Sequence, residues 1–573
     1  MIDTTNRLSL HGKTHLCCPT REDRCLWAQS NDSDADEPIT TPHNLANEDE
    51  DRHDGNYKWS AQTLAIALPA LAGMMTDPIL SLVDTLFVGQ LGMSTAKTAA
   101  ITTAPTSTSS SIPLAALGAC TSIFHLAFHC VKGTTATTAT LIAGAVVRDG
   151  QTQQRDEDDG TTRKETTLIA QTSMEQAFIT GTVISLFLFV FGTNCLNAMG
   201  IPASSSALFS SAFTYLNYRA VAAPAVVLLT ASEGIFRGFG DVITPWKVSL
   251  VVAGLNLVLD PFCMFRKQSL GLGLGIKGAA VATSFSQLCG ALLYGTLLLR
   301  KGVLRSSSNG ESILKIAWKK LTRIVSRKND ESAELKQKKR TVALTILRAN
   351  ATMILKQGSL LLGWAYATSR ATRMGHSVVA AHQMGLSIWM LFSYALDGIS
   401  VAAQVLMARA IEELRIAETN PQEFATQQNK VRSLSMYMMT SSIIQGLIVS
   451  AAILALFKLQ PSFILTNDSA VRTNLLQLFP HLSAQMTLVS ATLVAEALTV
   501  GGGRFKWLAF GTTVSSLIAM MRLRFSNNLI EVWSGGIVSL FLGRLITALL
   551  AVLDMNGFIR RRKGAVTKAT VEA

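Results

Sequence analysis

The chain has 573 residues, of which 49% are hydrophobic and 16% are charged. Its mean hydropathy of +0.32 excludes an ordinary soluble protein, because such proteins carry a more polar surface. The net charge of +13 could suit a nucleic-acid partner, but the basic residues gather beside apolar stretches, where they set membrane topology. We therefore expect a multi-pass integral membrane protein in a lipid bilayer, with no nucleic-acid partner.

Residues 1–58 are polar, become acidic toward their end and contain no apolar core. This composition is typical of disorder, and the segment lacks the apolar centre of a secretory signal. We expect a disordered cytoplasmic tail. A role in organelle targeting is the open alternative, because the first twenty residues are poor in acid.

Twelve stretches between Ser60 and Phe558 are apolar over about the 20 residues that a helix needs to cross a bilayer. They lie near 61–91, 112–147, 174–199, 212–235, 244–265, 272–299, 341–374, 379–408, 434–457, 476–502, 506–522 and 529–557. Their length and continuous apolarity differ from the short alternating strands of a membrane barrel. The predicted fold is an all-α membrane protein of twelve transmembrane helices.

The basic residues concentrate in a linker at 300–340, after six predicted spans, and in a tail at 559–573, after twelve. The positive-inside rule therefore places the linker and both chain termini on the cytoplasmic side, or on the stromal side of a plastid membrane. The linker is also expected to contact anionic lipid. An acidic segment at 148–166 is predicted to be a solvated cytoplasmic loop.

Two sequence landmarks recur at nearly the same distance. "AALG" at Ala115 and "AAHQ" at Ala380 are 265 residues apart, and "SEGIFRGFG" and "AEALTVGGG" are 263 residues apart. These offsets predict a duplication, with one lobe at 59–299 and a second at 341–558. The first lobe also has a surplus segment at about 94–113. Paired six-helix repeats of this kind are typical of secondary transporters.

Five stretches carry a resemblance to a known family. They are "PALAGMMTDPILSLVDTLFVGQLG", "YLNYRAVAAPAVVLLTASEGIFRGFGDVITP", "NLVLDP", "LGIKGAAVATSFSQ" and "AAHQMGLSIWMLFSYALDGISVAAQ". In this order they resemble the multidrug and toxic compound extrusion (MATE) transporters, most closely the DinF-like branch, which includes organic-acid exporters of plants. The resemblance implies two six-helix lobes related by a pseudo-twofold axis, a central cavity, and export driven by protons or sodium.

Acids inside the apolar spans indicate a coupling site. Asp77 and Asp84 are seven residues apart, nearly two helical turns, and Asn256 and Asp260 are four apart, so each pair shares a helix face. The resemblance puts Asp84, Asn256, Asp260 and Thr283 at the cation or proton site of the first lobe. Two carboxylates in one apolar pocket favour a proton carrier, whereas the set of oxygen ligands also suits Na⁺.

Each of these residues also has a structural interpretation. Asp77 could pair with a buried hydroxyl or with Arg219, Asn256 could join helices, and Thr283 could bond its own helix backbone. The seventh span, 341–374, contains no acid, which argues against a coupling site in the second lobe.

A second set of residues is assigned to the substrate cavity or a gate: Arg219, Glu233, His382, Gln383, Asp397 and Glu496. Here too there are alternatives: Arg219 as an interfacial anchor, His382 as a hydrogen-bonded core histidine, and Asp397 in packing between lobes. Glu496 could instead be an exposed acid near the cytoplasmic end. Glu233 and Glu496 depart from the glutamine and aspartate common in the family.

We expect an antiporter that exports small organic molecules, either organic cations and other xenobiotics or citrate-like organic acids, in exchange for H⁺ or Na⁺. The alternatives are a flippase for a lipid-linked substrate and a membrane receptor or scaffold that does not transport. The sequence shows neither a phosphate-binding loop nor a pair of nucleophile and base that would indicate an enzyme. We expect no cofactor or metal beyond the coupling ion. We expect a monomer, in a plasma, vacuolar or plastid membrane.

Overall fold

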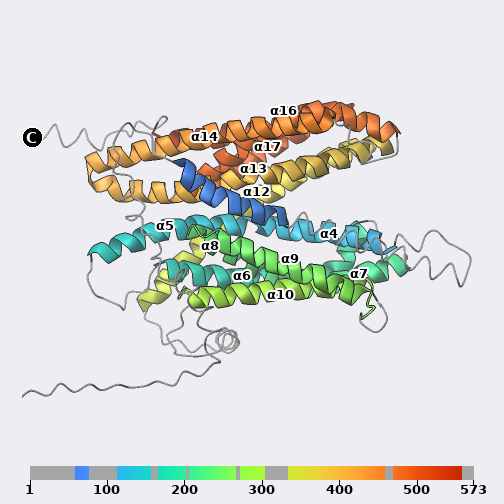
Figure 1. Ribbon diagram of the computed structural model, residues 1–573, viewed down its shortest axis with the longest axis horizontal. Coiled ribbons are helices and arrows are strands. Elements are labelled where there is room, and N and C mark those ends of the chain that lie inside the picture. The colour runs from blue at the N-terminus through green and yellow to red at the C-terminus, as the bar shows by residue number, and fades with distance from the viewer. Residues whose placement is uncertain are drawn as a thin grey trace, which may run out of the picture. The chain divides into compact units, whose positions relative to one another are not determined.

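The computed structural model describes residues 59–76, 112–155, 165–199, 201, 206–265, 271–303, 333–458 and 469–557, which are almost entirely helical (Figure 1). In the first half, a helix over 59–76 is followed by α4 (Ile112–Val131), α5 (Gly133–Arg155), α6 (Glu165–Ala198), α7 (Ser206–Val221), α8 (Ala223–Gly238), α9 (Ile243–Met264) and α10 (Ile276–Arg300). The all-α prediction is confirmed.

Among the described residues, the second half begins with five α-helices of at least 20 residues each. They are α12 (Ala333–Arg373), α13 (His376–Ile416), α14 (Pro421–Lys458), α16 (Ser469–Gly501) and α17 (Phe505–Arg524), with a short 3-10 turn η1 (Ala417–Thr419) before α14. The last span is broken into α18 (Leu529–Glu531), the π-helical η2 (Val532–Ile537) and α19 (Val538–Met555). Both halves thus follow the same pattern of long helices joined by short turns.

Eight helices among the described residues are long and apolar enough to cross a membrane, or nine if the bent pair α7 and α8 forms one span. Helices α12 and α17 coincide with the predicted spans 341–374 and 506–522 but fall outside this apolar set. Of the predicted first span, the structure describes the residues up to Thr76. The positions agree with the predicted spans, and the full count of twelve stays a prediction.

Small residues allow the helices within each half to approach closely. A Cβ added to Gly181 of α6 would lie 2.5 Å from the Cα of Pro224 in α8, and one added to Gly446 of α14 would lie 2.5 Å from the Cα of Thr487 in α16. In lipid, where apolar helix faces gain little from meeting one another, such close backbone packing holds helices together.

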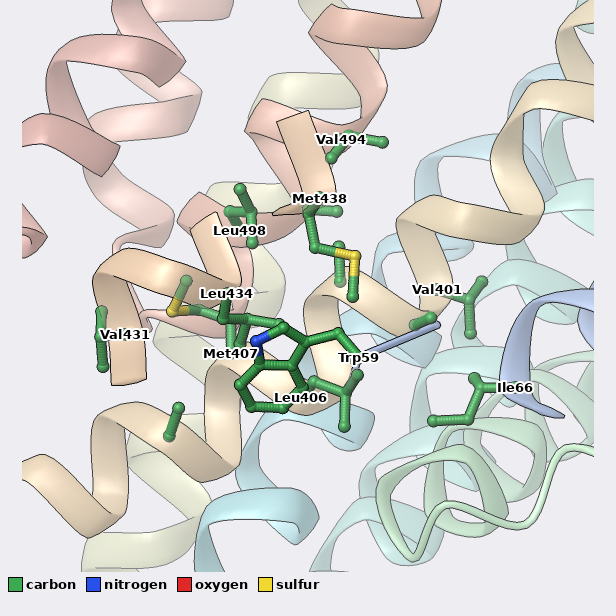
Figure 2. Packing of buried hydrophobic residues seen from close by; sticks show 14 of the residues in the cluster. Trp59, Ile66, Val401, Leu406, Met407, Val431, Leu434, Met438, Val494 and Leu498 are labelled. Atoms are coloured by element: carbon green, nitrogen blue, oxygen red, sulfur yellow. The ribbon is translucent and has the colours of Figure 1, made fainter. Parts of the chain in front are cut away.

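The first helix links the two halves. Its buried side chains Trp59 and Ile66 pack with Val401, Leu434 and other apolar side chains of the second half (Figure 2). Further along, a Cβ added to Gly73 would lie 3.8 Å from the Cα of Trp246 in α9. Residues 59–76, assigned by sequence to the first lobe, therefore begin against second-half helices and then approach the first half.

A seam between the halves follows α5 and α13. The Gln404 side-chain amide donates to the Ala136 carbonyl at 2.7 Å and to the Thr140 hydroxyl at 3.0 Å. Further along the seam, Arg148 pairs with Glu412 at 2.9 Å. By the predicted topology, these contacts approach the cytoplasmic end.

Two predicted loop boundaries need correction. Helix α5 continues to Arg155, inside the acidic segment 148–166 that was predicted to be a loop, because Arg148 gains carboxylate partners on neighbouring helices. Helix α12 begins at Ala333, so the end of the linker 300–340 is helical. The tails 1–58 and 559–573 and most of the insertion 94–113 lie outside the described residues.

Candidate functional site

A cavity of about 520 Å³ lies between the two halves. It is lined from the first half by residues of the first helix and of α4, α5, α8, α9 and α10, and from the second half by residues of α12, α13, α16 and α19. Its charged and larger polar lining residues include Lys132, Glu233, Arg237, Asn256, Thr283, Gln287, Lys356, Asp397, Gln404, Glu496 and Arg544. The cavity therefore contains several of the residues that the sequence singles out.

Helix α9 supplies the polar pair of the first half. Asn256 is fully buried and Asp260 is 1% exposed, whereas Leu257 and Val258 are exposed on the other side of the helix. The four-residue spacing thus turns both polar side chains inward, as predicted. Asn256 lines the cavity, and Asp260, although buried, is not part of its lining.

The Asn256 side chain has unused hydrogen-bonding capacity. Among the described residues, neither its amide nitrogen nor its amide oxygen has a hydrogen-bond partner, although both atoms are buried. A buried polar group without a partner costs about 1–3 kcal/mol, so such a group usually faces a water, an ion or a ligand. This amide is therefore suited to bind an ion or a polar ligand that enters the cavity.

Thr283 lines the cavity from α10, and its hydroxyl donates to the Ala279 carbonyl of its own helix at 2.8 Å. This bond matches the structural interpretation, and the hydroxyl oxygen can still accept a hydrogen bond or bind a cation. The predicted partners Asp77 and Asp84 lie outside the described residues. The helix that leads to them reaches the cavity, because Met74 and Thr76 are part of its lining.

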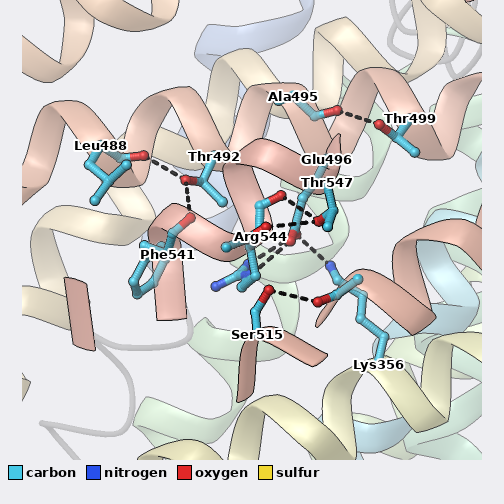
Figure 3. Close-up of polar contacts among 12 residues, drawn as sticks. Lys356, Leu488, Thr492, Ala495, Glu496, Thr499, Ser515, Phe541, Arg544 and Thr547 are labelled. Carbon is cyan, nitrogen blue, oxygen red and sulfur yellow. Dashed lines mark hydrogen bonds and ion pairs between the residues drawn. The ribbon is translucent and has the colours of Figure 1, made fainter. Parts of the chain in front are cut away.

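The second half presents a buried ion cluster. Glu496 of α16 is 3% exposed. Its carboxylate accepts two hydrogen bonds from the Arg544 guanidinium, at 2.8 and 2.9 Å, and pairs with the Lys356 ammonium at 2.7 Å (Figure 3). The interpretation of Glu496 as an exposed acid is therefore wrong, because two cations from α12 and α19 enclose it.

Sequence reasoning missed Lys356 and Arg544. The seventh span contains no acid, but the lysine in its middle is itself a signal, because charged residues inside a span are rare and mostly functional. Arg544 also lies over the Phe541 ring, with the guanidinium carbon 4.6 Å from the ring centre. Such stacking and the bidentate pairing with Glu496 fix its orientation.

Two further acids line the cavity. The Asp397 carboxylate is hydrogen-bonded by the Ser400 hydroxyl one turn later, and Ser400 also bonds the Asp397 carbonyl at 2.6 Å. Glu233 pairs with Arg237, one turn further along α8. Both acids are therefore held by a local partner on their own helix.

Three predicted cavity residues lie elsewhere. Arg219 is not part of the cavity lining, but it donates at 2.7 Å to the side chain of Gln287, which is. His382 is fully buried, and its Nδ1 accepts a hydrogen bond from the Trp533 indole at 3.1 Å, which makes it a hydrogen-bonded core histidine. Gln383 is exposed. These side chains support the helices around the cavity or face outward.

Each half has an ion pair at a turn near the predicted cytoplasmic end. The turn residue is the acid of the pair in the first half and the base in the second half. In the first half, Asp241 pairs with Lys301 at 2.7 Å, and in the second half Arg504 pairs with Asp554 at 2.6 Å. Burial alone raises the pKa of Asp241, but hydrogen bonds from Lys301 and Thr244 outweigh it and lower the pKa below the usual value. Positions 241 and 504 are 263 residues apart, the offset of the predicted repeat.

Comparisons with known proteins agree with this architecture. The MatE family model matches residues 163–262, which include Glu233, Asn256 and Asp260. Protein DETOXIFICATION 44, chloroplastic, of Arabidopsis thaliana is 29% identical over 401 residues, which cover 69% of this chain and 66% of that protein. Protein DETOXIFICATION 43 of the same plant is 26% identical over 564 residues, which cover 88% of this chain and 93% of that protein.

The fold is similar to solved MATE transporters. A multidrug resistance MATE family transporter in an outward-facing conformation aligns with a TM-score of 0.62 at 20% identity, over 86% of this chain and 94% of the other. A MATE transporter of Vibrio cholerae in the bent form aligns with a TM-score of 0.64 at 17% identity, over 87% and 96%. In sequence and in fold, this chain is therefore similar to the MATE family of transporters.

Proposed function

We propose that this protein is a cation-coupled antiporter that exports small organic anions through the cavity between its halves. The observation that carries the substrate class is the cluster in which Lys356 and Arg544 share one carboxylate, that of Glu496, beside the cavity. Names of MATE relatives that include multidrug export support the transport of organic molecules in general.

An anionic group suits this wall of the cavity. Glu496 neutralises one of the two cations, so the cluster as a whole carries a residual positive charge. The Lys356 ammonium has three donors, of which the ion pair with Glu496 uses one. A substrate carboxylate would gain charge-assisted hydrogen bonds there.

Coupling is proposed for the first half. Asp84 and Asp260, with Asn256 and Thr283, would bind a proton or Na⁺ from the outer side, and the vacant hydrogen-bonding capacity of Asn256 supports a ligand in this region. Neutralisation of the carboxylates would let the first span bend near Pro78 and expel the substrate. Substrate and cation then compete, because each favours a different state of the same element.

The seam supports export toward the outer side. The bonds from Gln404 to α5 and the Arg148 pair with Glu412 join the halves near the predicted cytoplasmic end. A cavity joined at that end would release substrate on the opposite side of the membrane.

Flux into proteoliposomes tests the proposal. Purified full-length protein would be given an imposed pH or Na⁺ gradient and a panel of labelled organic anions and cations. We expect gradient-driven anion flux. Transport of organic cations alone would overturn the substrate class but leave the antiporter intact, and absence of flux for every solute would favour the flippase or receptor alternatives.

Among the three candidate membranes, the relatives named chloroplastic favour a plastid membrane. Imaging of the full-length protein with a fluorescent tag after residue 573 tests this choice. Fluorescence at the plasma or vacuolar membrane would contradict it.

A further inference from the structure

A second cavity, of about 540 Å³, lies beside the seam. It is lined by α5, by α12 and α13, and by the turn at 501–507 that leads into α17, and it shares no lining residue with the central cavity. It therefore spans both halves, near the predicted cytoplasmic end, without being part of the site described above. We name it the basic pocket.

The charges of the basic pocket are almost all positive. Its charged lining residues are Arg148, Arg348, Glu412, Arg415, Arg504 and Lys506. Glu412 is buried and pairs with Arg148 at 2.9 Å and with Arg415 at 2.7 Å. The lining of this one cavity thus contains five basic side chains and one acidic side chain.

Two of the cations are available to a ligand. Arg348 of α12 and Lys506 of α17 are exposed, and neither forms an ion pair with another described residue. They belong to different helices that meet at this pocket. A single anionic group between them would join α12 to the start of α17, and it would also lie within the field of Arg415.

Exposed aromatic side chains beside the pocket indicate the level of the lipid headgroups. Trp507, part of its lining, is 43% exposed, and Phe510, one turn further into α17, is 63% exposed. Tryptophan gathers where a membrane protein crosses from the hydrocarbon core to the headgroups, and an exposed phenylalanine next to it marks the lipid side. A basic pocket between helices at this level is suited to the headgroup of an anionic lipid.

We infer that the basic pocket binds the phosphate of an anionic phospholipid from the cytoplasmic leaflet, through Arg348 and Lys506. This site is independent of the transported substrate. Because the pocket is built from both halves, the bound lipid would stabilise the state in which α5 and α13 are joined.

Binding of short-chain lipids to purified full-length protein in detergent tests the inference. Native mass spectrometry would follow the titration of dioctanoyl phosphatidylglycerol, with dioctanoyl phosphatidylcholine as the zwitterionic comparison and inorganic pyrophosphate as the soluble phosphate. We expect phosphatidylglycerol to bind more tightly than the other two. The double variant Arg348→Gln, Lys506→Gln should weaken its binding about tenfold or more, since each basic side chain near a membrane contributes about 1 kcal/mol.

Matched controls separate the site from general charge. Arg522→Gln, Arg524→Gln removes the same charge from the other end of α17 and should leave the affinity unchanged. The swap Arg348→Lys, Lys506→Arg keeps both charges and should retain most of the binding. Equal binding of both lipids, or equal losses in the double variant and its control, would overturn the inference. Tighter binding of pyrophosphate would support a phosphate site but overturn the lipid as its source.

Discussion

The two walls of the central cavity differ in whether their buried polar groups have partners. On the first half, Asn256 has an amide with no hydrogen-bond partner among the described residues, next to the buried Asp260. On the second half, Lys356 and Arg544 both pair with the carboxylate of Glu496. A wall whose amide has no hydrogen-bond partner can bind and release a ligand, whereas a cluster of ion pairs keeps its charge. From this difference we propose that the exchangeable cation binds in the first half and that the second half supplies a fixed electrostatic surface.

The largest expected effect on transport comes from removing the first-half carboxylates. Asp260→Asn and Asp84→Asn mimic the neutral acid, so each should abolish gradient-driven flux while the protein stays folded. Asp77→Asn should be milder, because this residue can be structural. Flux assays in proteoliposomes, with size-exclusion profiles for folding, check the series. Unchanged flux in both Asp84→Asn and Asp260→Asn would break the comparison and move the coupling site to the second half.

The largest expected effect on stability comes from Glu496→Gln. This change leaves Lys356 and Arg544 buried without their shared carboxylate, which costs about 3–5 kcal/mol in comparable buried pairs.

The thermal midpoint of unfolding in detergent measures this effect, with Glu496→Asp as the charge-preserving control. An organic anion that binds between the two cations should raise the midpoint more in Glu496→Gln than in the unmodified protein. An unaltered midpoint in Glu496→Gln would show that the cluster contributes little to the fold.

A smaller effect is expected from Lys356→Gln. The bidentate pair of Arg544 with Glu496 remains, so the protein should fold, but the residual positive charge is lost. We expect the KM for an organic anion to rise about tenfold, as for the loss of one hydrogen bond to a charged group. Lys336→Gln, at an exposed position of the same helix, is the matched control. A KM equal to that of the control would remove Lys356 from the substrate site.

The smallest effect is a loss of stability on breaking the ion pair at the turn of the first half. Asp241→Asn removes the pair with Lys301, whose side chain is 47% exposed, so the loss should be only about 0.5–1 kcal/mol. Because the pKa of Asp241 is lowered by folding, its contribution is complete at neutral pH and disappears as the pH falls below about 4. The thermal midpoints of the two proteins should therefore differ at pH 7 and converge in acid. A constant difference would contradict this assignment.

The sequence predicts the helices and the inward orientation of Asn256 and Asp260 well, because both depend on local patterns. Apolar runs of membrane length identify spans, and the spacing of Asn256 and Asp260 identifies a helix face. The Lys356, Glu496 and Arg544 cluster joins three helices that are distant in sequence, so no spacing rule reveals it. The same holds for Arg148 and Glu412, since Arg148 falls in a segment whose acidic composition favoured a loop.

The most direct test of the division between the walls is the ratio of anion flux with and without an imposed cation gradient. The variants Asp260→Asn and Lys356→Gln would be reconstituted in parallel into liposomes of the same composition. The account predicts that Asp260→Asn lowers this ratio to about one, whereas Lys356→Gln keeps the ratio of the unmodified protein and raises the KM. A ratio that falls in Lys356→Gln and persists in Asp260→Asn would contradict it.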